Sequence, residues 1–293
     1  MRKRLFLPLA TLLSISLAAA ASLDFLGPKG TYSDQAAQLA AQHYGLTVGQ
    51  TLPTITAVST GVAAGTSPYG LIPNENSAGA FVAETSGLLA KGDPGWRVVG
   101  ELTLPISNTL LVKPGTPASA VTTIISHPQP FKQSAAYLAA NYPNAARQEV
   151  SSTAAAAEAV SKGDGTSAAI SAPAAAGVYG LSVLAADIQD DKNNATSFWV
   201  VQRAGQPWTV TVPNHVLVML DAPAGSPALG DLLSRLRSAS FRPRNVQSWP
   251  LGGVLGGYRF VVALDSDTGI RLTHVQQQVA AVKGALLLGA YRK

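Results

Sequence analysis

The sequence predicts an α/β protein in which a two-lobed domain is followed by a smaller ferredoxin-like domain. Between residues 23 and 205, short apolar runs alternate with alanine-rich segments of helical periodicity, which is typical of sheets covered by helices. Proline and glycine at residues 114–117 interrupt this pattern and indicate that a second lobe begins there. After residue 207 the expected order of elements becomes βαββαβ, which is the ferredoxin-like order.

Residues 1–22 are expected to be an export signal and not part of the fold. Three basic residues at positions 2–4 precede an apolar run at 5–17 and a small-residue stretch at 18–22, which is the order found in secretory signals. The run is shorter than the span of about 20 residues that crosses a bilayer. We therefore expect an exported protein, free of the membrane after cleavage, with an uncleaved anchor or a buried helix as the alternatives.

Charge and cysteine content narrow the function classes. The 21 basic and 16 acidic residues give a formal net charge of +5, and removal of Arg2, Lys3 and Arg4 leaves 18 against 16, or +2. A nucleic-acid partner is therefore not expected. The absence of cysteine excludes disulfide bonds, thiolate chemistry and cysteine-based zinc sites.

The first lobe is expected over residues 23–114 and the second over about 115–188. Ser33 is the expected N-cap of the first helix, and Gly45 is expected to end it. A strand at 198–202 could return to the first lobe, and two lobes joined by crossing segments place a ligand cleft between them. In chain order, strands are expected at 23–26, 69–72, 96–104, 108–112, 121–125 and 168–171, and helices at 33–43, 80–90, 128–141 and 152–161.

The last domain is expected over residues 212–293. Its strands are predicted at 215–220, 244–249, 258–264 and 285–291, and its helices at 228–238 and 272–282. Domains of this plan often bind small regulatory ligands.

Four polar segments stand beside apolar strands, where α/β folds place their sites. Residues 25–33 contain a glycine turn and a helix start that could face an anion. Residues 73–77 offer amides and a hydroxyl, residues 126–133 offer serine, histidine and glutamine, and residues 188–198 form a polar loop leading into a strand. Taken singly, each segment is weak evidence for a site, because a turn, a helix cap, an Asx-rich loop or solvated surface would account for it.

Taken together and in order, these segments resemble the prephenate dehydratase family over the whole chain from about residue 23 to residue 291. The matching stretches are FLGPKGTYS, ENS, SHPQPF followed by Gln133, SSTAAAA, VYGLSVL and IQDDKNNATSF. The resemblance implies a bilobal, periplasmic-binding-protein-like catalytic domain at 23–205 followed by an ACT regulatory domain. It also implies an enzyme of phenylalanine biosynthesis that converts prephenate into phenylpyruvate, with loss of water and carbon dioxide and without a metal or organic cofactor.

The resemblance also implies roles for individual residues. Thr196 matches the threonine of the family's Thr-Arg-Phe motif, which is held to assist the leaving hydroxyl, and would act here as a hydrogen-bond donor in a dry cleft. Further residues are expected to contact the substrate: Asn76, Ser126 and Gln133 at its hydroxyl and carboxylates, Lys29 and Thr31 near its anionic end, and Ser77, Ser197 and Phe198 around them.

Two departures from the family pattern bear on activity. Ser197 replaces an arginine that is expected to pair with a substrate carboxylate, and Lys132 or Lys192 are the candidate substitutes. Asn108 stands where the family often has histidine.

The family senses phenylalanine at the interface between ACT domains, through a Gly-Ala-Leu turn and a Glu-Ser-Arg-Pro strand end. Pro227 replaces the glycine and removes a backbone donor, while Gln247 and Trp249 remove the charged pair. Weak or absent inhibition by L-phenylalanine is therefore expected. The family's pairing of ACT domains also implies a homodimer or a tetramer. The corresponding positions here are Ala228, Leu229, Gln247, Ser248 and Pro250.

A different class of protein remains the alternative: an exported binding protein that holds an aromatic or dicarboxylate ligand without converting it. Such a protein needs no proton donor at Thr196, so the joint presence of Thr196, Asn76, Ser126 and Gln133 favours the enzyme. Arogenate in place of prephenate is left open.

Overall fold

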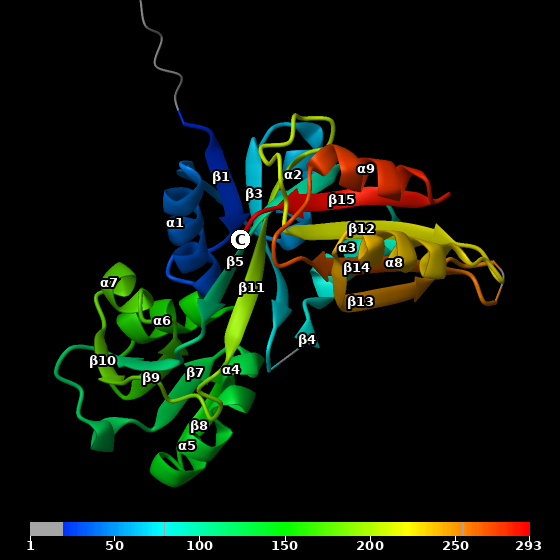
Figure 1. The fold of residues 1–293 in the computed structure, drawn as a ribbon. Coiled ribbons are helices and arrows are strands. Elements are labelled where there is room, and N and C mark those ends of the chain that lie inside the picture. Colours follow the sequence, from blue (N-terminus) through cyan, green and yellow to red (C-terminus); the bar gives the residue numbers. More distant parts are fainter. Residues whose placement is uncertain (1–19, 79, 254) are drawn as a thin grey trace, which may run out of the picture.

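The computed structural model describes residues 20–78, 80–253 and 255–293. The described chain is built on two sheets (Figure 1), and this mixed architecture confirms the predicted α/β class. A ten-stranded sheet runs through the first lobe and the C-terminal domain, in the order β13-β14-β12-β15-β5-β11-β3-β1-β2, with β4 beside β3. A five-stranded sheet, in the order β10-β6-β9-β7-β8, forms the second lobe.

The first lobe contains three elements that the sequence did not reveal, β2, α2 and β4. β4 occupies the first two residues of the helix predicted at 80–90, and α3 begins only at Ala83. β2 has no buried residue and so lacks an apolar run, while α2 contains Gly61 and several β-branched residues of low helix propensity. β11 lies antiparallel between β3 and β5, which confirms that this strand returns to the first lobe. The elements are β1 (Ser22–Leu26), α1 (Tyr32–Tyr44), β2 (Thr47–Leu52), α2 (Ile55–Ala64), β3 (Tyr69–Asn76), β4 (Ala80–Phe81), α3 (Ala83–Lys91), β5 (Trp96–Pro105) and β11 (Ala195–Arg203).

The second lobe begins earlier in the chain than expected. β6, which we assigned to the first lobe, pairs with β9 and β10 in the smaller sheet. The chain therefore crosses between the lobes after β5 and again before β11, and the boundary near residue 115 lies too late. The elements are β6 (Thr109–Val112), a 3-10 turn (Ala118–Ala120), β7 (Thr123–Ser126), α4 (Pro128–Gln133), α5 (Ala135–Asn141), β8 (Ala146–Glu149), α6 (Thr153–Lys162), β9 (Ser167–Ser171), α7 (Ala175–Tyr179) and β10 (Ser182–Ala185).

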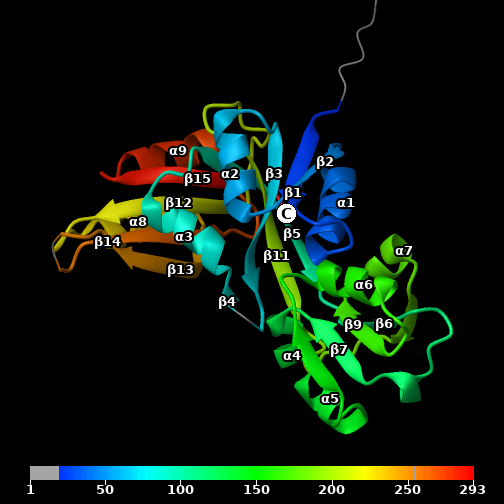
Figure 2. The same cartoon turned by 180° about the vertical axis from the view of Figure 1, so that it is seen from behind.

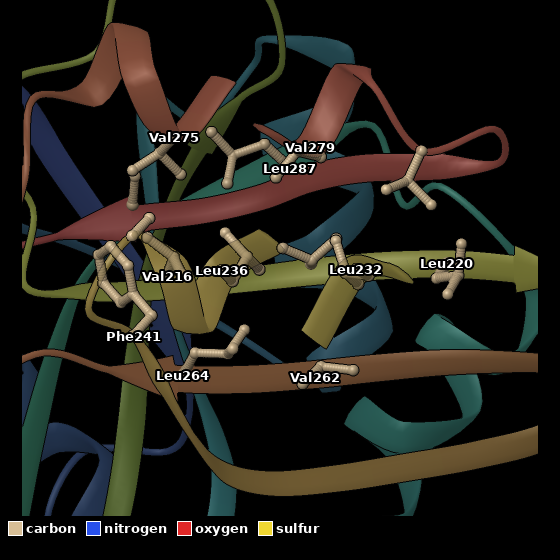
Figure 3. Close-up of a cluster of buried hydrophobic side chains, with 14 of the residues drawn as sticks. Val216, Leu220, Leu232, Leu236, Phe241, Val262, Leu264, Val275, Val279 and Leu287 are labelled. Carbon is tan, nitrogen blue, oxygen red and sulfur yellow. The ribbon is translucent and has the colours of Figure 1, made fainter. Parts of the chain in front are cut away.

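The C-terminal domain has the predicted ferredoxin-like topology. Its strand order β13-β14-β12-β15, with every neighbouring pair antiparallel, is the one that two βαβ units produce. Helices α8 and α9 cover one face of this sheet, and Figure 3 shows Leu232, Leu236, Val275 and Val279 packed over the strands. The elements are β12 (His215–Ala222), α8 (Ala228–Ser238), β13 (Arg242–Pro250), β14 (Tyr258–Asp265), α9 (Leu272–Ala280) and β15 (Ala285–Tyr291).

The opposite face of the C-terminal sheet packs against the first lobe. Met219, Val261 and Leu288 share one buried cluster with Val58 of α2 and Leu89 of α3, and Figure 2 shows both helices lying against these strands. β15 also joins the edge of β5 in parallel. The C-terminal strands thus continue the sheet of the first lobe.

The predicted export signal and possible membrane-spanning helices can be compared with the described residues. The predicted export signal, residues 1–22, lies outside them except for its last three residues. Within the described ranges, every helix is too short or too polar to cross a bilayer.

Candidate active site

A cavity of about 380 Å³ lies between the two lobes. Its walls are the β1–α1 turn, the ends of β3 and β11, and the first residues of α4 and α6. Asparagine, glutamine, histidine, tyrosine and hydroxyl side chains line it, and among the described lining residues there is no aspartate, glutamate, lysine or arginine. The cleft expected between the lobes is therefore present, and its chemistry rests on neutral groups and backbone amides.

Thr196 and Asn76 face each other across the pairing of β11 with β3. The Asn76 amide nitrogen donates to the Thr196 hydroxyl oxygen at 2.9 Å, and the Asn76 carbonyl oxygen accepts from the backbone N–H of Ala78 at 3.0 Å. Because a backbone N–H can only donate, it fixes which end of the amide faces Thr196. The Thr196 oxygen is thereby an acceptor from Asn76, and its own proton is left to donate into the cavity.

Gln133 is oriented by Asn108, which links the two lobes. The Asn108 amide nitrogen lies 3.4 Å from the Gln133 side-chain oxygen and 3.2 Å from the Ser134 hydroxyl, and the Asn108 oxygen accepts from the Tyr32 hydroxyl at 2.9 Å. Burial, with the charge of Asp187, raises the pKa of Tyr32 well above its usual value, so Tyr32 stays a donor. This series of hydrogen bonds leaves the side-chain amide nitrogen of Gln133 available to donate into the cavity.

His127 caps helix α4 through its ring. Its Nδ1 accepts from the backbone N–H of Gln129 at 3.3 Å. An accepting Nδ1 places the proton of the neutral ring on Nε2, which adds another donor to the cavity wall.

Helices α1 and α6 both begin at the cavity, but their N-termini differ in charge. At α1, Thr31 is the cap instead of the expected Ser33, and the buried Asp34 carboxylate in the first turn accepts from Gly30 N–H at 2.8 Å. The first turn of α6 has no acidic residue, and Ser152 caps it by accepting from Ala155 N–H at 3.0 Å. The positive end of the α6 dipole is therefore uncompensated where it meets the cavity.

Four predicted residues line this cavity: Asn76, Thr31, Gln133 and Thr196. The hydroxyls of Ser151, Ser152 and Thr153 line it as well. Sequence reasoning gave these three residues no role, although the serine pair before an alanine-rich helix is a cap signal.

Four other predicted residues lie outside the lining. Ser126 is fully buried and donates to the Ile170 carbonyl at 2.8 Å, and Phe198 belongs to the core of the first lobe. The Ser77 hydroxyl accepts from the backbone N–H of Ala195 at 2.9 Å. Lys29 is exposed, although its carbonyl accepts from the Tyr179 hydroxyl of the second lobe at 3.2 Å. The structure therefore does not place these four side chains against the cavity.

Ser197 faces away from the cavity. It follows Thr196 on a strand, so the two side chains point to opposite faces of the sheet. With the Asn74 amide turned to satisfy its neighbours, its nitrogen lies 3.0 Å from the Ser197 hydroxyl and its oxygen accepts from the Trp199 indole at 3.2 Å. The geometry therefore gives no support to carboxylate binding at position 197, and Lys132 and Lys192 are likewise absent from the described lining.

The predicted regulatory residues are divided between two faces of the C-terminal sheet. Gln247 turns toward the first lobe, where its side-chain oxygen accepts from the Ser86 hydroxyl of α3 at 2.9 Å. Ala228 and Leu229 begin α8 and pack into the core on the other face, while Ser248 and Pro250 are exposed.

Comparison with known proteins identifies the family of the chain. The prephenate dehydratase family model matches residues 23–206. The chain is 34% identical over 252 residues to the prephenate dehydratase of Mycolicibacterium vanbaalenii, covering 81% of this chain and 80% of that protein. It is 32% identical over 235 residues to the bifunctional chorismate mutase/prephenate dehydratase of Escherichia coli, covering 80% of this chain and 60% of the longer enzyme.

A solved structure extends the likeness beyond the matched domain. The crystal structure of prephenate dehydratase in complex with L-Phe from Arthrobacter aurescens superposes with a TM-score of 0.80 at 28% identity. The superposition covers 93% of this chain and 90% of that one, so it includes the C-terminal domain. From its sequence, its fold and the residues of its cleft, this chain belongs to the prephenate dehydratase family.

Proposed function

We propose that the protein is a hydro-lyase, a carbon–oxygen lyase that converts prephenate into phenylpyruvate. The observation that carries the proposal is the Thr196 hydroxyl, which Asn76 holds as a donor into a cavity of neutral groups. Prephenate carries two carboxylates and a ring hydroxyl, and it needs such donors at both kinds of group. A cavity of about 380 Å³ is in the range of small-molecule sites.

The N-terminus of α6 is the strongest place for a carboxylate of the substrate. Among the described residues, no acceptor contacts the backbone N–H groups of Thr153 and Ala154, and the first turn carries no acidic side chain. Gln133 and His127 supply donors on the same wall. An anion at this position would gain from the helix dipole and from direct hydrogen bonds without any cationic side chain.

In the proposed reaction, the bond between the ring and its carboxylate breaks and carbon dioxide leaves. The electron pair of that bond enters the ring, the bond between the ring and the hydroxyl oxygen breaks, and the ring becomes aromatic. The leaving oxygen takes up one proton from the solvent and departs as water. Threonine is a poor acid, so Thr196 contributes by hydrogen-bonding the negative charge that develops on this oxygen.

The decisive test is turnover of prephenate by the chain from Ser22 onward. Formation of phenylpyruvate is monitored by its absorbance in base. Thr196→Ala is expected to lower kcat by about 10²-fold or more, whereas Thr196→Ser, which keeps the hydroxyl, should retain a substantial fraction of the activity. Absence of turnover in the wild-type protein, with prephenate still raising its Tm, would favour the binding-protein alternative.

The C-terminal domain is proposed to be an ACT domain that joins copies of the chain into a dimer or tetramer and responds weakly to L-phenylalanine. Its ferredoxin-like topology and the L-Phe complex of the Arthrobacter relative support this. The contact of Gln247 with Ser86 and the proline at position 227 argue against tight binding. A phenylalanine dose series should show little inhibition, and loss of half the activity at micromolar concentration would contradict the proposal. Light scattering gives the oligomeric state.

Export is proposed from the basic, apolar and small-residue order of residues 1–22. Fractionation of producing cells and mass measurement of the N-terminus of the exported protein test it. An N-terminal residue between positions 19 and 23 is expected, and a full-length chain retained in the cytoplasm would contradict the proposal.

A further inference from the structure

Asn194 lies next to Asn76, in the loop that enters β11. Its side chain is buried, with only 2% of the residue exposed, and it is absent from the described lining of the catalytic cavity. Its side-chain oxygen accepts from the Asn76 amide nitrogen at 3.0 Å. Asn194 therefore contacts Asn76 without lining the cavity in which the substrate is proposed to bind.

The two protons of the Asn76 side-chain amide explain why Asn76 contacts both Asn194 and Thr196. The amide nitrogen carries two protons, and its two side-chain acceptors are the Thr196 hydroxyl at 2.9 Å and the Asn194 oxygen at 3.0 Å. The backbone carbonyl of Ala195 lies beside them at 3.2 Å. With Ala78 N–H bound to the Asn76 oxygen, the amide is held at both ends in a single orientation.

The backbone around Asn194 holds the residue in place. Its N–H donates to the Asp191 carbonyl at 3.3 Å, and its own carbonyl accepts from Ile106 N–H at 2.8 Å. Ile106 is itself part of the cavity wall. The backbone that carries the Asn194 side chain is thus held by the segment that also forms part of the cavity wall.

We infer that Asn194 is a positioning residue for the proposed dehydration, acting through Asn76. By accepting one amide proton, it directs the other to the Thr196 oxygen, and Thr196 must then present its own proton to the leaving hydroxyl. This inference rests on the proposed function, because it assigns Asn194 a role only in that reaction.

Folding stability alone gives a poor account of an amide at this position. The Asn194 side-chain nitrogen is buried and has no hydrogen-bond partner among the described residues. A buried N–H without an acceptor costs about 1–3 kcal/mol, a cost that an apolar side chain of similar size would avoid. An oxygen that serves Asn76 explains why an amide is tolerated there.

The test compares three variants with the wild-type chain by kcat, KM and Tm with prephenate. Asn194→Leu removes the acceptor while keeping the branched shape of the side chain, and it is expected to lower kcat about 10- to 100-fold, with KM within about threefold and with Tm unchanged or higher. Asn194→Asp keeps an oxygen at the same place and should recover most of the lost kcat. Asn193→Leu makes the same change at the exposed neighbouring residue and should leave kcat unchanged.

The outcomes separate this inference from the function on which it rests. A wild-type protein that does not convert prephenate overturns both. An active wild type with an equally active Asn194→Leu variant overturns only the role of Asn194, and so does a loss of kcat that Asp fails to rescue or that accompanies a lower Tm.

Discussion

The guanidinium of Arg244 donates two hydrogen bonds to the carboxylate of Glu101, at 3.1 and 3.0 Å. Arg244 belongs to β13 of the C-terminal domain and Glu101 to β5 of the first lobe. The Glu101 side chain is only 3% exposed and also accepts from Lys293 Nζ at 3.1 Å and from the Tyr291 hydroxyl. A buried carboxylate is thus shared by three donors of the C-terminal domain, beside the point where β15 joins β5.

This cluster makes the stability of the protein depend on acid pH. Burial alone would raise the pKa of Glu101, but the hydrogen bonds and charge of Arg244, with Tyr291 and Lys293, outweigh burial and lower that pKa from 4.5 to about 2. The difference of about 2.5 corresponds to about 3 kcal/mol of folding free energy at neutral pH. This contribution is present above pH 4.5 and is lost as the pH falls from about 4.5 to about 2.

Urea unfolding between pH 7 and pH 3 measures this effect. The Glu101→Gln variant should be less stable than wild type at pH 7, and the difference should shrink as the pH falls. Glu158→Gln, which breaks an exposed ion pair with Lys162, is the control and should change stability by less than about 1 kcal/mol. An unfolding free energy of Glu101→Gln that tracks wild type at every pH would contradict the prediction.

Gly289 allows the C-terminal sheet to join the first lobe. It pairs with Val98 across β15 and β5, and a Cβ added to it would lie 2.8 Å from the Val98 Cβ. Gly289→Ala must therefore displace one strand, and we expect a loss of about 1–3 kcal/mol in unfolding free energy. Gly230→Ala, in α8 with open space around its Cβ position, should be neutral or stabilising. Equal effects of the two substitutions would show that the junction is not tightly packed.

Restoring the family's arginine at position 197 should not improve substrate binding. Ser197 is paired with Glu75, whose carboxylate lies 3.4 Å from the amide of Asn245 in the C-terminal domain, so an arginine there would face the domain junction. Ser197→Arg should leave the KM for prephenate within about twofold. Ser151→Arg places the same cation on the cavity lining and should change KM. A tenfold lower KM for Ser197→Arg would show that this side chain reaches the cleft.

A carboxylate at the start of α6 should weaken substrate binding while stabilising the helix. Ala155 is the third residue of α6, and its N–H is bound by the Ser152 hydroxyl, so Glu or Gln at 155 completes a capping box. Ala155→Glu also places a negative charge at the proposed carboxylate site and should raise KM about 5- to 10-fold. Ala155→Gln is the uncharged match. Steady-state kinetics of both variants test this prediction. An equal KM for Ala155→Glu and Ala155→Gln would show that the start of α6 does not bind the substrate carboxylate.

Much of the fold could be predicted because the core strands and capped helices have local signals. The βαββαβ order, the strand over 198–202 that returns to the first lobe, and Gly45 after α1 all follow from apolar periodicity and turn residues. β2 and α2 were missed because neither has a strong local signal: β2 has no buried residue, and α2 contains glycine and β-branched residues. Contacts with neighbouring elements stabilise them instead. β6 was placed in the wrong lobe because an apolar run does not show which sheet it joins.

The sequence by itself determined the family and the two-part architecture, because ordered motifs and apolar periodicity are properties of the chain. It also predicted Thr196, Asn76 and Gln133 as site residues, and all three line the cavity. Only the tertiary structure decided which groups face the cleft and which way each amide points. Ser197 turns to the domain junction because neighbouring strand residues alternate between faces. The start of α6 reaches the cleft, and Asn194 reaches Asn76, because distant segments meet there. Hydrogen-bond direction depends on partners more than 100 residues apart in the chain, such as Asn76 and Asn194, and no local pattern records it.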